Sequence, residues 1–145
     1  MPATPERIWA WFAGMDEHYR AWHPDHVVWR TEHGSPVTVG SVVYFHERIG
    51  WAPVAMRCRI VEARPGEYLR YEGLFPHSLV GAGGSFALAP ADGGSEVTVE
   101  ARMGVRVPVV GPLLDGLLRA LFPMRQFQRH LGEEGRNLAQ MLNGN

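Results

Sequence analysis

Apolar and polar residues alternate with a period of two over most of the central part of the chain, which is typical of half-buried β-strands. The segment Val42–Ile49 is the clearest example, because Val43, Phe45, Glu47 and Ile49 would share one face of a strand. Turns rich in Gly, Pro or Asp separate this segment from others of the same kind. The pattern therefore predicts six strands, at Val27–Glu32, Val42–Ile49, Ala55–Ala63, Tyr68–Leu74, Ser85–Pro90 and Glu96–Val105.

Two short helices are predicted before the first strand. Thr4 offers a capping hydroxyl and Pro5 is favourable at the first helical position, so a helix should begin here and run to about Ala13. A second helix is expected over Asp16–Ala21, and Pro24 stops it. The chain is thus expected to enter its first strand from a helical N-terminal segment.

A long helical segment, Pro112–Leu142, is predicted after the last strand, with a bend or break at Pro123. Apolar residues in its second part follow the spacing of one helix face. This stripe consists of Phe127, Leu131, Leu138 and Leu142. Arg129, Glu133 and Arg136 fall outside the stripe, so we expect their side chains to face solvent.

The composition indicates one soluble globular domain covering residues 1–145, since 46% of the residues are hydrophobic and 20% are charged. The net charge of −1 and the lack of a basic run give no reason to expect nucleic acid as a partner. The sequence contains no lysine, which excludes Schiff-base chemistry. Cys58 is the only cysteine, so we expect a small core residue and no disulfide or thiolate cluster. The absence of a signal-peptide pattern and of an apolar run of about 18 residues predicts a cytoplasmic protein without a membrane partner.

Two short helices, an antiparallel meander and one long helix together predict an α+β architecture. The long helix can bury its apolar stripe only against the concave face of a curved sheet. A sheet that grips a helix in this way encloses an apolar cavity, which is a natural site for a small hydrophobic or aromatic ligand.

Glu47 is a carboxylate on the apolar face of its predicted strand, where it is costly unless it is paired, protonated or bound to a metal. His130 and Glu134 are four residues apart on the C-terminal helix, so they share one side of it at the edge of the apolar stripe. Taken alone, that pair is equally consistent with a surface ion pair. Packing of the helix on the sheet would instead bring the pair to Glu47.

Two further histidines, His23 and His26, lie between the second helix and the first strand. Either could complete a site with Glu47, and Asp25 could orient a ring nitrogen through a hydrogen bond. Each is also consistent with a hydrogen-bonded loop residue packed near the neighbouring tryptophans. The residues alone do not choose between the two histidines.

The order of the elements resembles the helix-grip fold of the START / polyketide cyclase superfamily over nearly the whole chain. This resemblance implies a curved antiparallel sheet of about six strands around the long C-terminal helix. A narrower pattern is similar to the phloretin and diacetylphloroglucinol hydrolases: Tyr-x-x-Trp-His-Pro-x-His ending at His26, a Glu on an early strand, and His-x-x-x-Glu on the last helix. Those enzymes cleave an aryl–acyl carbon–carbon bond with a metal, usually zinc. By this resemblance the metal ligands would be His26, Glu47, His130 and Glu134.

The expected function is therefore that of a metal-dependent hydrolase acting on a small aromatic or polyketide-like ketone. A divalent metal, most simply zinc, would polarise the carbonyl and lower the pKa of a bound water. A proton donor for the ring carbon is expected among Tyr44, Tyr71 and His23. Two alternatives stay open: a non-catalytic carrier or sensor of a hydrophobic ligand, and a metal-free polyketide cyclase or dehydratase that uses His and Glu for acid–base catalysis.

Overall fold

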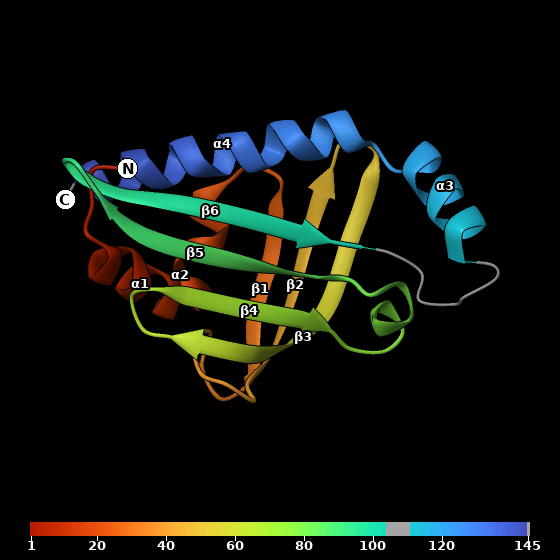
Figure 1. Ribbon diagram of the computed structural model, residues 1–145, viewed down its shortest axis with the longest axis horizontal. Coiled ribbons are helices and arrows are strands. Elements are labelled where there is room, and N and C mark those ends of the chain that lie inside the picture. Colours follow the sequence, from red (N-terminus) through yellow and green to blue (C-terminus); the bar gives the residue numbers. More distant parts are fainter. Residues whose placement is uncertain (104–110, 145) are drawn as a thin grey trace.

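The computed structural model describes residues 1–103 and 111–144 of the chain (Figure 1). Six strands form one antiparallel sheet, and each strand pairs with its neighbours in sequence order. The strands are β1 (His26–His33), β2 (Val42–Ile49), β3 (Ala52–Arg64), β4 (Tyr68–Gly73), β5 (Gly83–Ala91) and β6 (Gly94–Arg102). The predicted α+β architecture is confirmed, although β6 ends three residues before the predicted Val105, which lies outside the described residues.

The helices are α1 (Pro5–Ala13), α2 (Met15–Trp22), α3 (Gly111–Leu121) and α4 (Met124–Asn143), with a short 3-10 helix, η1 (His77–Val80), between β4 and β5. The hydroxyl of Thr4 accepts a hydrogen bond from the backbone N–H of Arg7 and caps α1 as predicted. Pro123 separates α3 from α4, which confirms the predicted break. Within the described part of the chain, none of these helices combines the length and apolar character needed to cross a membrane.

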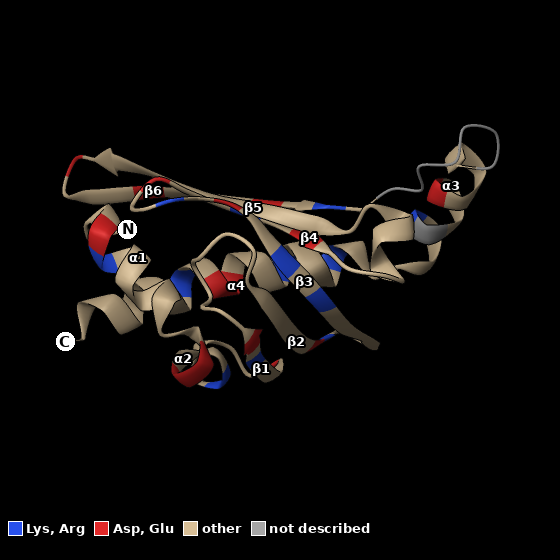
Figure 2. Ribbon diagram, turned by 90° about the horizontal axis from the view of Figure 1, so that it is seen from below, with Lys and Arg blue, Asp and Glu red and all other residues tan. Residues whose placement is uncertain are grey.

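The sheet curves from β6 round to β1, and α4 lies along its concave side (Figures 1 and 2). This arrangement is the helix-grip fold. Leu138 and Leu142 are buried in the interface, whereas Arg129 and Arg136 are exposed, as the helix pattern predicts. Leu131 is only half-buried, because its side chain lines a cavity instead of packing into the core.

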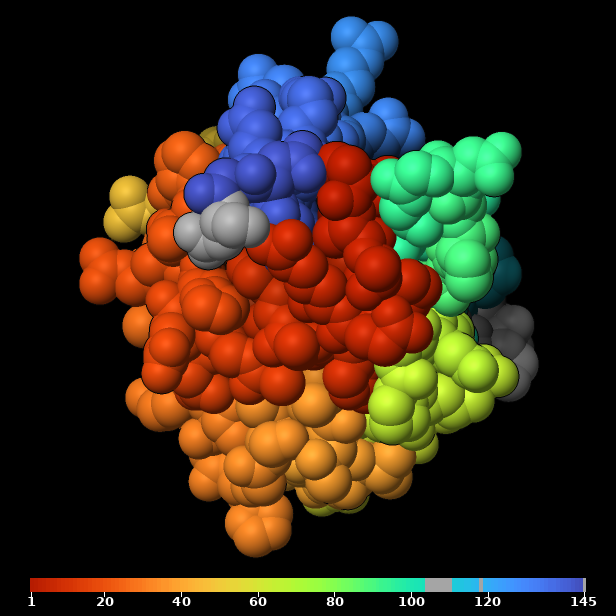
Figure 3. Space-filling model, turned by 90° about the vertical axis from the view of Figure 1, so that its left-hand side faces the viewer, coloured from red at the N-terminus to blue at the C-terminus, as the bar shows by residue number. Residues whose placement is uncertain are grey.

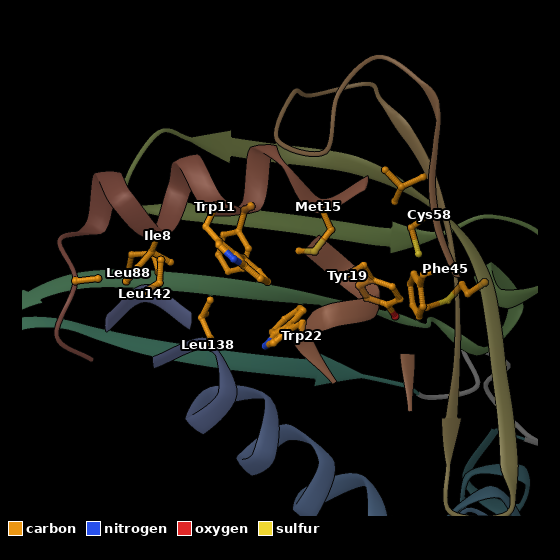
Figure 4. Packing of buried hydrophobic residues seen from close by; sticks show 14 residues of the cluster. Ile8, Trp11, Met15, Tyr19, Trp22, Phe45, Cys58, Leu88, Leu138 and Leu142 are labelled. Carbon is orange, nitrogen blue, oxygen red and sulfur yellow. The ribbon is translucent and has the colours of Figure 1, made fainter. Parts of the chain in front are cut away.

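The main core lies where α1, α2 and the C-terminal half of α4 meet the sheet (Figure 4). Ile8, Phe12, Trp22 and Leu138 are at most 5% exposed. Cys58 is fully buried in the same cluster, which confirms the prediction of a core residue. Burial, and then the nearby charge of Glu47, raise the pKa of its thiol to about 12, so it is not a reactive thiolate.

The N-terminal segment closes one end of the molecule (Figure 3). Its backbone is tied to β6, because the N–H of Ser95 donates to the carbonyl of Met1 and the Ser95 hydroxyl donates to the carbonyl of Ala3. The amino terminus in turn donates to the carbonyl of Ser95 at 2.7 Å. In Figure 1 this closed end lies opposite α3.

Candidate metal centre

The pairing of β1 with β2 brings His26 opposite Glu47. The two residues are direct partners in the antiparallel ladder, and the register shifts between His26 and Val28, immediately beside this pair. Such irregularities re-aim a side chain relative to the regular pleat. The first strand pair therefore supplies one imidazole and one carboxylate at neighbouring positions.

α4 supplies His130 and Glu134, one helical turn apart. The rotation of α4 is fixed against α2 by two hydrogen bonds: the indole N–H of Trp22 donates to the carbonyl of Glu134, and the amide of Asn137 donates to the carbonyl of Trp22, both at 2.9 Å. Because the first of these bonds involves the backbone of Glu134 itself, it helps to set the direction in which the Glu134 side chain leaves the helix.

The four side chains converge on one point. His26 Nε2 lies 2.8 Å from Glu134 Oε1 and 3.9 Å from Glu47 Oε1. His130 Nε2 lies 3.4 Å from Glu134 Oε1 and 3.5 Å from Glu47 Oε2. One ligand atom from each residue lies within 4.8 Å of all the others. His26, His130 and Glu134 are buried, and the Glu47 side chain is 14% exposed.

Both imidazoles are held so that Nε2 faces the two carboxylates. His26 Nδ1 lies 2.8 Å from the carbonyl oxygen of Tyr19, which can only accept, so Nδ1 carries the hydrogen. The other ring nitrogen, Nε2, lies 2.8 Å from Glu134 Oε1. His130 Nδ1 lies 3.4 Å from Asp25 Oδ2, while its buried Nε2 has no hydrogen-bond partner among the described residues. Two imidazole nitrogens and two carboxylates aimed at one point fit a divalent cation, to which each imidazole would offer its Nε2 lone pair.

The electrostatics of the cluster also favour a positive charge at this point. Burial alone would lower the pKa of His130, but the carboxylates of Glu134 and Glu47 raise it to about 10. Burial would raise the pKa of Glu134, but His130 and His26 hold it below its ordinary value. In the absence of metal, a proton on His130 thus supplies the charge that a bound cation would otherwise supply.

Tyr19 joins this cluster, although its position in the sequence indicated no role beyond a place in the motif. Its hydroxyl donates a hydrogen bond to Glu47 Oε1, and its ring stacks on His26 with centroids 3.9 Å apart (Figure 4 shows its position). Burial, and then the charge of Glu47, raise the pKa of Tyr19 well above its usual range, so the phenol stays neutral and donates. A contact between α2 and β2 cannot be read from sequence spacing.

His23 lies beside the four-residue cluster and is not part of it. Its Nδ1 accepts the backbone N–H of Asp25 at 3.0 Å, so its Nε2–H donates to Glu133 Oε2 at 3.1 Å. The structure thus brings His26, and not His23, to Glu47 and Glu134. Glu133 lies outside the apolar stripe and is half-exposed, and its carboxylate also holds the buried His23 ring.

Glu47 and Glu134 line a cavity of about 860 Å³ between the sheet and the helices. Its walls are mostly apolar, with aromatic rings from helix and sheet: Phe12, Trp29, Phe45 and Phe86. A space of this size and lining is typical of a small-molecule site with a few convergent polar groups.

The three expected proton donors are placed differently with respect to this cavity. Tyr71 lines it, and burial raises the pKa of its hydroxyl, so the phenol is neutral. Tyr44 does not line the described cavity, because it lies on the other face of β2 with the Arg30 guanidinium 5.2 Å from its ring centre. His23 does not line it either, since its ring is turned toward Glu133. Tyr44 and His23 are therefore poorly placed to reach a bound ligand.

Comparison with known proteins gives one family and several similar folds. A family model described as "Polyketide cyclase / dehydrase and lipid transport" matches residues 1–137. The solved structure of TTHA0849 from Thermus thermophilus is similar with a TM-score of 0.73 and 15% identity, covering 99% of this chain and 92% of that chain. Ara h 8.0201 is similar with a TM-score of 0.67 and 16% identity, covering 99% and 93%.

A third solved structure, CV1439 from Chromobacterium violaceum, is similar with a TM-score of 0.62 and 20% identity, covering 97% of this chain and 91% of that chain. A search of curated proteins found no significant match. At such identities the structural similarities establish the fold and leave the chemistry of the site to be argued from its own residues.

Proposed function

Because this chain belongs to the polyketide cyclase / dehydrase and lipid transport family, we propose that it acts on a small aromatic or polyketide-like ketone held in the helix-grip cavity. The proposed activity is that of a metal-dependent hydrolase, which cleaves the carbon–carbon bond between an aromatic ring and its acyl group. The narrower resemblance to the phloretin and diacetylphloroglucinol hydrolases suggested this chemistry.

One observation carries the proposal: two imidazoles and two carboxylates from three separate elements converge beside the apolar cavity. His26 Nε2 and His130 Nε2 face the carboxylates of Glu47 and Glu134 at 2.8–3.9 Å. A stability role explains such a buried cluster poorly, because burying four ionisable groups together is expensive. A ligand site explains it directly.

His26, Glu47, His130 and Glu134 would hold the metal, and two nitrogen with two oxygen donors suit zinc best. Bound there, the metal would polarise a substrate carbonyl and lower the pKa of a water molecule. The chain itself orients the donors. The Tyr19 carbonyl fixes the His26 ring and the Tyr19 hydroxyl fixes the Glu47 carboxylate.

The cavity supplies the remaining requirements for an aryl ketone. Its aromatic walls suit a flat ring. Hydrolysis places the water oxygen on the carbonyl carbon and leaves the bonding electron pair on the ring carbon, which must then take a proton. Tyr71, neutral and lining the cavity, is the proposed donor of that proton. The products are the deacylated ring and a carboxylic acid.

The same cavity favours one alternative, a non-catalytic carrier or sensor of a hydrophobic ligand, since its walls are mostly apolar. A metal-free cyclase or dehydratase would use the same histidines and glutamates as acid and base. Metal content separates the hydrolase from both alternatives. Turnover of an aromatic polyketide then separates the cyclase from the carrier.

The test is an assay of the untagged protein with a panel of acylated polyhydroxybenzenes, following release of the carboxylic acid by chromatography. We expect release that is lost after chelation, restored by zinc, and absent in Glu134→Gln. The matched variant Glu96→Gln changes an exposed carboxylate on β6 and should keep full activity. Tight binding of these compounds without acid release, in protein loaded with zinc, would overturn the hydrolase proposal in favour of the carrier.

A further inference from the structure

Large apolar side chains are exposed at one end of the molecule, the end opposite the N-terminal helices (Figure 1). They come from three segments on this side of the molecule that also border the cavity: the β2–β3 turn, the β4–β5 connection and α3. Each is more than half exposed. We call this surface the apolar end, and it consists of Trp51, Phe75, Leu79, Leu113, Leu117 and Leu121. Several large exposed apolar side chains around one cavity are typical of an interaction site.

α3 leaves several leucines exposed instead of burying them as an ordinary surface helix does. Asp115 and Arg119, one turn apart, line the cavity, although Arg119 is also exposed, and Leu113, Leu117 and Leu121 are each more than half exposed. A helix on a protein surface in water normally turns its apolar stripe inward and its charges outward. This exposure of leucines is favourable only if that face of α3 meets an apolar phase.

The charged residues around the apolar end are mainly arginines. Arg48 lies next to the β2–β3 turn, Arg119 is on α3 and Arg125 is in the first turn of α4; all three are exposed. None of them forms an ion pair with any residue that the structure describes. By contrast, Arg57 on the sheet pairs with Glu32 at 2.7 Å. Asp115 on α3 is the one carboxylate in these segments against the three arginines, so this end of the molecule, as far as the structure describes it, carries a net positive charge.

We propose that the apolar end docks on the surface of an anionic phospholipid bilayer. The exposed leucines and Phe75 would enter the apolar boundary, Trp51 would sit at the headgroup level where tryptophan is favoured, and the arginines would contact lipid phosphates. A second copy of the chain is a poorer partner, because symmetric contact through this end would oppose two sets of unpaired arginines.

Docking in this orientation would place the cavity next to the lipid. His77, Val80 and Met103 line the cavity and adjoin the segments of the apolar end. A hydrophobic ligand dissolved in the bilayer could then enter the cavity without crossing water. This proposal does not depend on a metal or on hydrolysis. It differs from the expectation of no membrane partner, which rested on the lack of a signal-peptide pattern and of a spanning segment.

The test is co-sedimentation of the full chain with vesicles of phosphatidylcholine alone and of phosphatidylcholine mixed with phosphatidylglycerol. We expect binding to the mixed vesicles that weakens with added salt, and little binding to the neutral ones. Leu113→Ser/Leu117→Ser should reduce the partition coefficient at least about tenfold. Arg48→Gln/Arg125→Gln should remove the preference for the anionic lipid. The control is Val39→Ser, which changes an exposed apolar residue on the β1–β2 loop and should bind as the wild type does.

Two further readouts keep the result unambiguous. Circular dichroism and metal retention of each variant should match the wild type, so a change in vesicle binding is separable from failure of the metal site or of the fold. Wild-type protein that binds neither kind of vesicle overturns the proposal. So does a wild-type dimer in light scattering that Leu113→Ser/Leu117→Ser converts to a monomer, because the occupant would then be a second copy.

Discussion

Glu134 contacts both histidines of the candidate metal centre, since its Oε1 lies 2.8 Å from His26 Nε2 and 3.4 Å from His130 Nε2. Glu134→Gln keeps the shape of the side chain and removes its charge. We expect metal affinity to fall by more than the roughly 10–100-fold that loss of an outer hydrogen-bond partner costs. Metal competition with a chromophoric chelator measures this change.

Glu133→Gln is the matched control for that substitution, because it changes the adjacent carboxylate on the same helix. Glu133 holds His23, which lies outside the four proposed ligands, and a glutamine oxygen can still accept the His23 hydrogen bond. Metal affinity should therefore stay near that of the wild type. If Glu133→Gln loses the metal and Glu134→Gln keeps it, the assignment of ligands on α4 is wrong.

Asp25 acts on the site through His130. Its Oδ2 lies 3.4 Å from His130 Nδ1, so it favours the tautomer in which Nε2 is free to bind a metal. Asp25→Asn should lower metal affinity by about 10–100-fold while leaving the unfolding temperature nearly unchanged. Asp92→Asn, in the exposed β5–β6 turn, serves as the control in the same chelator competition. Equal metal affinities for Asp25→Asn and Asp92→Asn would show that Asp25 does not orient His130 for metal binding.

Protonation of His130 couples the stability of the metal-free protein to pH. The pKa of His130 is about 10 in the fold against an ordinary value of 6.5, so above pH 6.5 the folded chain keeps a proton that the unfolded chain releases. The stabilisation is complete below pH 6.5 and is lost as pH rises through 10. Denaturant unfolding with chelator present should show the free energy of unfolding falling between pH 6.5 and 9.0. The range stops at 9.0, the ordinary pKa of a cysteine, because above it ionisation of Cys58 in the unfolded chain would add its own pH dependence. His130→Gln should flatten that slope; an unchanged slope would contradict the assignment.

At the scale of elements, the grip of α4 on the sheet depends on a few buried side chains of its stripe. Leu138 is 2% exposed, so Leu138→Ala should reduce the free energy of unfolding by about 2–5 kcal/mol. Leu113 on α3 is 81% exposed, so Leu113→Ala should change the free energy of unfolding by no more than about 0.5 kcal/mol. Urea denaturation measures both. Similar losses for the two leucines would mean that α3 packs in solution against something the described fold lacks.

Local sequence patterns are sufficient to predict the position of most helices and strands. Val42–Ile49 was predicted with the bounds that β2 has, because alternation and flanking glycines act within the segment itself. Pro123 ended α3 as predicted, since proline blocks a helix through its own ring. Leu131 was predicted to be buried and is half-buried, because helix phase says which face a residue occupies and not whether that face meets protein or a cavity.

The site was less accessible from sequence, because its contacts join distant segments. The apolar face of β2 pointed to Glu47, and helix spacing pointed to His130 with Glu134. Register with β1, which decides between His26 and His23, depends on strand pairing that no local pattern encodes. Tyr19 was missed for the same reason, since its contact with Glu47 depends on how α2 lies against the sheet.

Across the whole molecule, the two ends differ in a way that suits ligand entry. The N-terminal helices and the tie between Met1 and Ser95 close one end (Figure 3), whereas the apolar end adjoins the residues that line the cavity. The proposed metal ligands come from β1, β2 and α4, so no single element contains the site. Correct assembly of the helix-grip fold is therefore a precondition for metal binding.

The most direct test of the proposed metal centre is anomalous X-ray diffraction from crystals of the untagged protein grown with zinc. We predict one strong peak at the zinc edge, with His26 Nε2 and His130 Nε2 at about 2.0–2.1 Å and oxygens of Glu47 and Glu134 at about 2.0–2.2 Å. A crystal without a peak between these four residues, or with its peak at His23 and Asp25 instead, would contradict the account.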